Sequence, residues 1–417
     1  MAREMDGRLG LTLRLAAVTV TATLTACGSA GATPLVHRGD VVPVPGGSLT
    51  ADDVAAAQTA FGVDLLQEVC RDAADQDVLL SPASAAQALS LLYPAGAGPT
   101  ADALQDLLHL PAWSPELVAA MREHTAALDG LRYAGDPDDE DAPDSLQTSN
   151  RLWTARGLAP DPGYLDDVAT ALAADVRALD FAGDPAGATD RINATVAEDT
   201  RGRIQDLFDR PLPPGTQAVI TNALHLQARW AVPFTGTGEA PFATPSGTRT
   251  VDMMAGGSGR LRTSGGWQGV ELPYRDGTLA AVAVLPPEGT APCAVDAATL
   301  AALQSGTPED VGVRLPRMTV EQTHELLVPL TALGLPAAGD FPALGGPLQV
   351  AQVVQKTFLA VDEEGTEAAA ATGIALEASA RDPASRVVSF DRPFLLLLTD
   401  TATRSPLFLA AVHSPGG

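Results

Sequence analysis

The chain has 417 residues, 46% of them hydrophobic, which is enough to fold into one large domain or two smaller ones. Its 51 acidic and 26 basic residues give a formal net charge of −25. Because phosphate groups are bound by clustered Lys and Arg, this balance argues against a nucleic acid as a partner. An acidic surface would attract a basic protein, although acidity more often only keeps a protein soluble.

The first residues have the pattern of a secretion signal. Three arginines within the first 14 residues precede an apolar stretch from Leu15 to Leu24, which is too short to cross a bilayer. The stretch ends in Leu-Thr-Ala-Cys, which resembles a bacterial lipobox. We therefore expect residues 1–26 to be a lipoprotein signal peptide and Cys27 to carry the lipid that anchors an extracellular protein to the membrane. The alternative is an ordinary signal with a chance cysteine.

The rest of the chain divides into a tether and a domain. Residues 27–50 are rich in Gly, Pro, Ser and Val, and we expect them to be a flexible, lipid-attached tether. Residues 51–417 are expected to form the folded domain. Cys70 and Cys293 either pair as a disulfide in the exported protein or stay buried as free thiols, and the sequence leaves both possibilities open.

The domain begins with helical patterns and continues with strand patterns. Because the strands do not alternate with helices, the order favours an α+β fold. The acidic, turn-rich residues 134–145 predict a solvated loop. Apolar spacing predicts helices near 52–69, 82–92, 101–110, 115–132, 163–175, 188–200 and 320–333. Strands are expected at 219–226, 269–272, 279–285, 311–315, 349–361, 386–390, 393–399 and 406–412.

The patterns of common enzymes are missing from the sequence. It has no G-x-S-x-G elbow, no Walker loop and no C-x-x-C pair. His324-Glu325 begins like a zinc-protease motif, but Val328 stands where the second His is needed. We therefore expect no catalytic residues, no metal and no cofactor. A triad assembled from distant residues remains the alternative.

The segment from Asp362 to Asp382 combines two conflicting signals. Its alanine run between glutamates is good helix-forming sequence. However, the even positions from 366 to 376 carry no charge, whereas the odd positions include Glu367 and Glu377. In an extended strand these two sets face opposite sides, and no proline interrupts the segment. The alternation favours a strand with one buried face.

Several motifs in this part of the chain resemble those of the serpin family of serine protease inhibitors. One of these motifs resembles the hinge of a serpin loop and consists of Glu363, Glu364, Gly365, Thr366, Glu367, Ala368, Ala369, Ala370 and Ala371. Val388 to Leu398 is similar to the family's C-terminal signature around D-R-P-F. Further blocks similar to those of the family lie earlier in the chain, in the same order as in the family: Ser81–Ser84, Ile192–Asn193, Thr200–Ile204 and Asn222–Phe234.

The resemblance implies a serpin fold with three β-sheets, about nine helices and an exposed reactive-centre loop. It also implies a mechanism, in which a serine protease cleaves the loop and forms an acyl-enzyme. The freed loop then inserts into the main sheet and the protease is distorted. We expect a monomer. The alternative is a non-inhibitory serpin that acts as a surface binding or chaperone-like lipoprotein.

The resemblance also assigns roles to individual residues. The hinge must stay free of bulk and charge at Gly365 and Thr366. The region where the sheet opens would contain Ser81, Ser84, Asn222, Trp230 and Gln355. Gln355 stands where many serpins have His, so we do not expect pH-sensitive opening.

The reactive bond can be placed in two ways. Counting from the hinge favours Ser379–Ala380, whose small side chains would suit an elastase- or subtilisin-like protease. Counting back from Phe390 points nearer to Arg381–Asp382, which would suit a trypsin-like protease. The segment around Arg122 and His124 is not a basic helix, so no heparin-type activator is expected.

Overall fold

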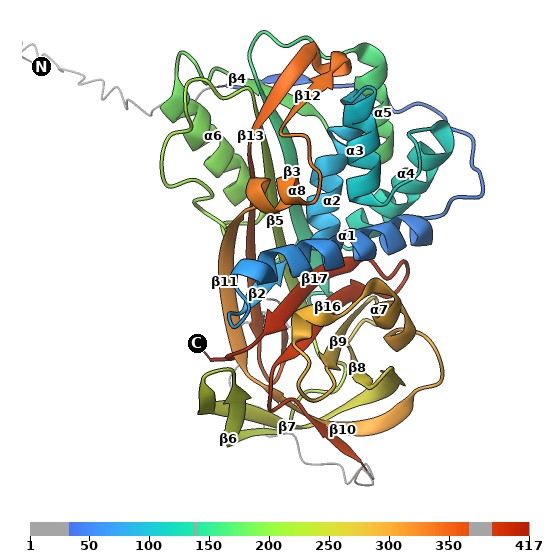
Figure 1. The fold of residues 1–417 in the computed structure, drawn as a ribbon, viewed down its shortest axis with the longest axis vertical. Helices are drawn as coiled ribbons and strands as arrows, with labels where there is room; N and C mark the ends of the chain where they lie inside the picture. Colours follow the sequence, from blue (N-terminus) through green and yellow to red (C-terminus); the bar gives the residue numbers. More distant parts are fainter. Residues whose placement is uncertain (1–32, 137–138, 140, 367–385, 417) are drawn as a thin grey trace, which may run out of the picture.

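Helices gather in one half of the elongated molecule and most strands of the second sheet in the other (Figure 1). The computed structural model describes residues 33–136, 139, 141–366 and 386–416. Cys27, the hinge residues 367–371 and the reactive-bond candidates 379–382 lie outside the described residues. The α+β class expected from the sequence is confirmed.

The helices begin where the sequence supplies caps. The side chain of Thr50 accepts a hydrogen bond from the backbone N–H of Asp53, and the backbone N–H of Thr50 donates to the carboxylate of Asp53. These two bonds form a capping box at the start of the first helix. Several later helices have Pro at their first position, where its missing N–H costs nothing. The described residues contain eight α-helices: α1 (Ala51–Asp72), α2 (Pro82–Ser90), α3 (Pro99–Leu108), α4 (Pro115–Asp129), α5 (Pro162–Leu172), α6 (Pro185–Asp199), α7 (Ala297–Leu303) and α8 (Leu327–Ala332).

The first sheet runs along the long axis of the molecule and carries the candidate site. Its strand order is β1-β4-β3-β5-β14-β13-β11, and β12 pairs with β13. The bounds are β1 (Leu35–His37), β4 (Val176–Leu179), β3 (Ser145–Ala155), β5 (Ala218–Arg229), β14 (Gly365–Thr366), β13 (Gly346–Val361), β11 (Met318–Glu325) and β12 (Ala338–Phe341).

The second sheet has the order β15-β10-β7-β8-β9-β16-β17-β2, and β6 pairs with β7. The described strands thus form two hydrogen-bonded networks, whereas three sheets were expected. The reason is β7, which pairs with β6 through residues 247–255 and with β8 through residues 260–264. The bounds are β15 (Val387–Ser389), β10 (Glu309–Pro316), β7 (Gly247–Ser264), β8 (Trp267–Pro273), β9 (Leu279–Leu285), β16 (Phe394–Asp400), β17 (Pro406–Val412), β2 (Val78–Leu80) and β6 (Gly236–Thr244).

Residues 33–50 differ from the flexible tether expected there. Strand β1 adds to the edge of the first sheet, with Leu35 opposite Ala178 of β4. Further on, the backbone N–H of Val42 donates to the hydroxyl of Thr170 in α5 at 3.0 Å. Composition suggested a linker, but the backbone groups of this segment find partners on the domain, which composition cannot show.

The prediction of a helix at 320–333 is also wrong for the first part of that range. Residues Met318–Glu325 form β11, which pairs with β13 along its whole length, and only Leu327–Ala332 is helical. Exposed residues of β11 alternate with more buried ones, as in a strand. The pairing with β13 and this burial therefore determine the conformation of the segment. No helix of the described residues is long and apolar enough to cross a membrane.

Three apolar clusters fill the interior, and the smallest lies between α6 and the first sheet.

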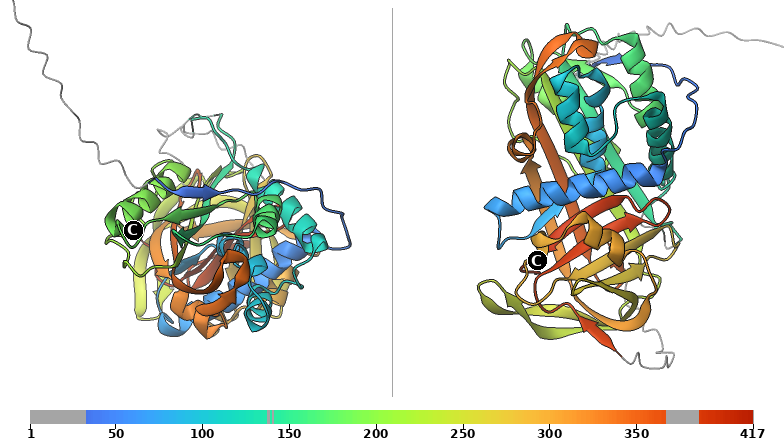
Figure 2. Two further views of the ribbon diagram at one scale, coloured as in Figure 1. Left: turned by 90° about the horizontal axis from the view of Figure 1, so that it is seen from above. Right: turned by 45° about the vertical axis from the view of Figure 1, so that its right-hand side comes forward.

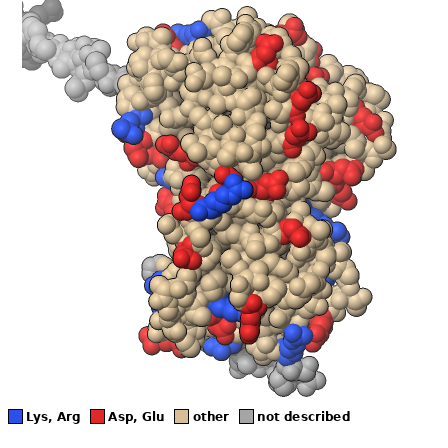
Figure 3. Space-filling model, in the orientation of Figure 1, with Lys and Arg blue, Asp and Glu red and all other residues tan. Residues whose placement is uncertain are grey.

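Of the two possibilities for the thiols, the structure has the disulfide, which joins Cys70 of α1 to Cys293 with their Cα atoms 6.5 Å apart. Figure 2 shows the long α1 crossing between the two halves of the molecule. The face seen in Figure 3 carries scattered acidic side chains and few basic ones, in keeping with the net charge of −25.

Candidate functional site

The central feature of the first sheet is the seam between its parallel strands β5 and β13. The two strands pair directly from Ala218 opposite Val350 to Leu224 opposite Thr357. Beyond that point β14 lies between them, with Thr366 opposite both Ala228 of β5 and Val361 of β13. The seam is therefore closed along most of its length and already holds one short extra strand at its end.

Gly365 allows this close approach of three strands. A Cβ atom at this position would lie 2.1 Å from the carbonyl oxygen of Ala228, so no side chain fits there. The carboxylate of Asp362 accepts hydrogen bonds from the backbone N–H groups of Glu364 (2.9 Å) and Gly365 (3.0 Å). Burial raises the pKa of Asp362. These bonds hold the turn that sends the chain from β13 back into the seam.

Thr366 points into the core of the protein and is 1% exposed. Its hydroxyl contacts that of Tyr274, and the ring of Tyr274 stacks on Trp230 with centroids 4.5 Å apart. The indole N–H of Trp230 donates to the carbonyl of Asp362 at 2.9 Å. Trp230 thus lies at the end of the seam, against the turn that precedes the hinge.

An ion pair holds the outer side of the same turn. Glu363 pairs with Arg317 and accepts a bond from the hydroxyl of Thr237. Burial opposes ionisation of Glu363, but these two bonds outweigh it, so its pKa lies below the ordinary value. The backbone N–H of Phe234 donates to the carbonyl of Glu363 at 3.0 Å.

A buried polar cluster lies beneath the middle of the seam. The amide of Gln355 on β13 donates to the side-chain oxygen of Asn222 on β5 at 2.6 Å. Asn222 donates in turn to Ser84 of α2 at 2.6 Å and to Asn150 of β3 at 2.9 Å. Gln355 also exchanges two hydrogen bonds with the backbone of Ser81. The cluster ties α2 to the two strands that border the seam.

The structure therefore brings together four of the five residues expected where the sheet opens, Ser81, Ser84, Asn222 and Gln355, and places Trp230 apart from them. Sequence reasoning missed Asn150. No motif marks it, and only the pairing of β3 with β5, which sets Asn150 opposite Asn222, brings it to the cluster.

Comparisons with known proteins agree with this arrangement. A family model described as Serpin (serine protease inhibitor) matches residues 56–415. An uncharacterised serpin-like protein of Thermococcus kodakarensis is 32% identical over 378 residues, which cover 87% of this chain and 86% of the relative. The leukocyte elastase inhibitor of Bos taurus is 29% identical over 391 residues, 87% of this chain and 100% of the relative.

Solved structures show the same fold. The native thermophilic serpin tengpin superposes with a TM-score of 0.77 at 23% identity, covering 91% of this chain and 97% of that chain. Human thyroxine-binding globulin, solved as a complex with thyroxine, superposes with a TM-score of 0.74 at 25% identity, covering 88% of this chain and 100% of that one.

Proposed function

Because the chain belongs to the serpin family, we propose that it traps serine proteases by inserting its cleaved reactive loop between β5 and β13. The observation that carries the proposal is the position of β14. The first two residues of the loop already occupy the place of a strand between β5 and β13, antiparallel to both. A cleaved loop would only have to continue along the same path.

The register of β14 fixes how far such a strand would reach. Thr366 lies opposite Ala228, so continuing the antiparallel pairing brings Leu376 opposite Ala218, the first residue of β5. The buried side of this strand would carry the even positions from 366 to 376, none of which is charged. The charged odd positions, Glu367 and Glu377, would face the other side of the sheet.

Insertion would supply the free energy for trapping. About ten residues would gain sheet hydrogen bonds at about 1 kcal/mol each, or on the order of 10 kcal/mol in total. A protease attached to the loop through its own serine would be pulled along with the strand. Distortion of its oxyanion hole would then stop deacylation. In this account the chain supplies the substrate bond and the new strand, and the catalytic groups belong to the protease.

The preferred protease depends on the reactive bond. Ser379–Ala380 fits a protease with a small specificity pocket, of the elastase or subtilisin kind, and the similarity to a leukocyte elastase inhibitor supports this choice. Arg381–Asp382 would instead fit a trypsin-like protease. We favour the first bond.

We further propose that the protein is held at the cell surface through a lipid on Cys27 and acts there as a monomer. The lipobox-like sequence supports the anchor. Two acyl chains on one cysteine would give stable binding to a membrane, which a single chain does not.

The proposed inhibition can be tested on denaturing gels after mixing the protein with elastase-, subtilisin- and trypsin-like proteases. Trapping gives a band of summed mass that survives denaturation, and sequencing of the released C-terminal peptide identifies the cleaved bond. A clean clip without the band would contradict trapping. That result would favour a serpin that only binds a ligand, as thyroxine-binding globulin binds thyroxine.

A further inference from the structure

Residues 33–41 cross the end of the molecule at which the direct pairing of β5 with β13 begins. The guanidinium of Arg156 donates to the carbonyl of Thr33 at 2.8 Å. Arg156 follows β3, and the backbone N–H of the last residue of β3 donates to the carbonyl of Gln217 at 2.8 Å. The next residue, Ala218, is the first of β5 and pairs with β13. The view from above in Figure 2 shows the segment running across this end.

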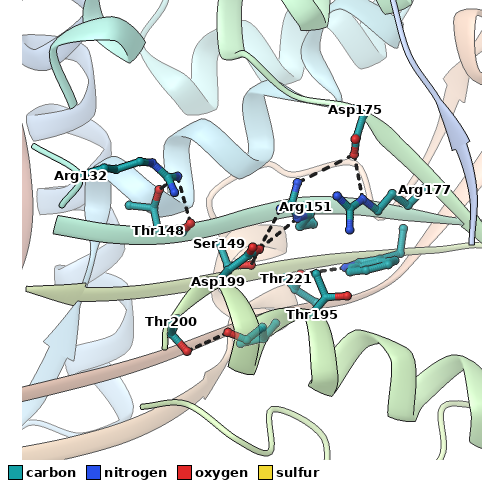
Figure 4. A network of polar contacts seen from close by, with 12 residues as sticks. Arg132, Thr148, Ser149, Arg151, Asp175, Arg177, Thr195, Asp199, Thr200 and Thr221 are labelled. Carbon is teal, nitrogen blue, oxygen red and sulfur yellow. Dashed lines mark hydrogen bonds and ion pairs between the residues drawn. The ribbon is translucent and has the colours of Figure 1, made fainter. Parts of the chain in front are cut away.

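The segment is fixed there by strand pairing and by a group of charged side chains. β1 pairs with β4 along its whole length, and Arg38 approaches Asp175 at 3.6 Å. Asp175 also accepts a hydrogen bond from Arg177 (2.9 Å) and is approached by Arg151 (3.8 Å). Figure 4 shows Arg151 between Asp175 and Asp199, which it meets at 2.8 Å. Three guanidinium groups thus share two carboxylates, an excess of basic charge in a chain whose net charge is −25.

The same segment exposes apolar side chains. Of the four large hydrophobic residues that are exposed in the described part of the chain, Leu35 (54%) and Val41 (67%) lie here. The side chain of Arg38 between them is 75% exposed, Arg156 is exposed as well, and Asp40 is the one acidic residue of the segment. Single exposed apolar side chains are ordinary, but two of them beside exposed arginines suit the boundary between lipid head groups and acyl chains.

The length of chain that precedes the segment limits its distance from a membrane. Cys27, the residue proposed above to carry the lipid, stands six residues before Thr33. An extended chain spans at most about 3.6 Å per residue, so these six residues reach about 20 Å. A lipid on Cys27 would therefore hold this end of the domain close to the bilayer.

The reactive loop starts from the opposite end of β5. Thr366, the last described residue before the loop, pairs with Ala228, which stands ten residues beyond Ala218 on β5. At about 3.3 Å per residue, these two points of the strand lie about 33 Å apart. The first sheet runs along the long axis of the molecule (Figure 1). A domain that stands on residues 33–41 would hold its loop more than about 30 Å from the lipid surface.

We propose that the surface formed by residues 33–41 and Arg156 lies against the lipid bilayer beside the anchor and turns the reactive loop away from the membrane. Leu35 and Val41 would enter the head-group boundary, and the arginines would meet lipid phosphates. The proposal rests on the lipid proposed at Cys27. It directs the inhibitor at proteases in the surrounding medium, because an active site at the membrane surface would lie more than about 30 Å from the loop.

The orientation can be measured on the full lipidated chain, reconstituted into vesicles of phosphatidylethanolamine and phosphatidylglycerol. With Cys27 lipidated and the other two cysteines joined as a disulfide, an introduced cysteine is the one thiol that a fluorophore can label. Ala159→Cys places the label just after β3, beside the proposed contact. Ser246→Cys places it in the turn between β6 and β7, in the other half of the molecule, and both positions are exposed. A quencher on the lipid head groups reports which label lies at the membrane.

Two pairs of substitutions test the contact itself. Leu35→Ser with Val41→Ser removes the apolar side chains of the segment. Val328→Ser with Val387→Ser is the matched control, because it removes the other two exposed large hydrophobic side chains, which lie in α8 and β15. Exposed side chains contribute little to stability, so both variants should unfold at the temperature of the wild type.

We expect the quencher to dim the Ala159→Cys label at least about three times more than the Ser246→Cys label, since the short chain holds only the first near the lipid. Leu35→Ser with Val41→Ser should reduce this difference to about half or less, and the control pair should leave it unchanged.

Equal quenching of the two labels in protein that floats with the vesicles would overturn the proposed contact. A difference that Leu35→Ser with Val41→Ser leaves intact would overturn it as well. Protein that does not float with the vesicles carries no lipid anchor, and the contact then fails together with the anchoring proposed at Cys27. The trapping of proteases is judged separately, on denaturing gels.

Discussion

Thr366 pairs with Ala228 of β5 at the point where β5 has parted from β13. The first side chain of the loop is therefore already buried in the sheet before any cleavage. This single pair defines the path and the register of the strand that would follow. It also makes the hinge the place where insertion is most easily blocked.

An arginine at this position should turn the protein from an inhibitor into a substrate. Thr366 is buried against Tyr274, and placing an unpaired charge there costs several kcal/mol. The hinge would stay outside the sheet, and deacylation would overtake insertion. For Thr366→Arg we expect the ratio of covalent complex to clipped protein to fall more than about tenfold.

Densitometry of denaturing gels with an elastase-like protease measures this ratio. Thr366→Ser keeps the hydroxyl and the small size and should trap as the wild type does. Undiminished trapping by Thr366→Arg would show that the hinge does not enter the sheet.

Loss of the central amide of the polar cluster should destabilise the native protein. Asn222→Ala removes the buried hydrogen bonds that the Asn222 amide makes with Ser84 and Gln355, at a cost of about 1–3 kcal/mol. Urea unfolding measures the loss. Gln349→Ala, at an exposed side chain of β13, should change the free energy of unfolding by less than about 0.5 kcal/mol. Equal effects of the two substitutions would contradict a special role for the cluster.

Acid should lower stability through His124, which is buried in α4 and contacts the hydroxyl of Ser405 at 2.6 Å. Burial lowers the pKa of His124 from 6.5 to about 4. Below pH 6.5 the unfolded chain therefore binds more protons than the native protein. The stability that the neutral, buried His124 contributes is fully present above pH 6.5 and is lost as the pH falls towards 4. The loss attributable to His124 should reach about 3 kcal/mol.

Urea unfolding at a series of pH values tests this, with His124→Gln as the comparison. Burial also lowers the pKa of His324 and His413, and their effect is common to both proteins. The decline between pH 6.5 and pH 4 should be smaller in His124→Gln. Parallel pH curves for the two proteins would rule out this origin of the acid sensitivity.

The proposed anchor predicts that Cys27→Ala changes where the protein is found. With the lipid, the protein should partition into the detergent phase of a cell extract, and without it into the aqueous phase. Metabolic labelling with a radioactive fatty acid gives a second measurement. Detergent partitioning that persists in Cys27→Ala would contradict lipidation at this residue.

The sequence predicted the elements whose signals are local. The period-2 alternation after Glu364 predicted a strand, of which the described residues include only Gly365 and Thr366, and these two form β14. Apolar spacing predicted many of the helices, such as the helix near 52–69, which is α1 in the structure. The family motifs also identified Ser81, Ser84, Asn222 and Gln355, which the structure brings into one cluster.

Features that depend on distant partners were not visible in the sequence. β11 was expected to be helical because its pairing with β13 cannot be read from its own residues. Asn150 joins the polar cluster only through strand register, and Asp199 meets Arg151 only because α6 lies over β3. Each of these contacts joins residues far apart in the chain, and local patterns do not encode them.

The most direct test of the account is the heat resistance of the protein before and after cleavage within residues 378–382. A gain of about 10 kcal/mol from the inserted strand predicts an unfolding temperature more than about 10 °C higher after cleavage. Differential scanning calorimetry of the intact and the cleaved chain measures the difference. An unchanged unfolding temperature would contradict the insertion of the loop between β5 and β13.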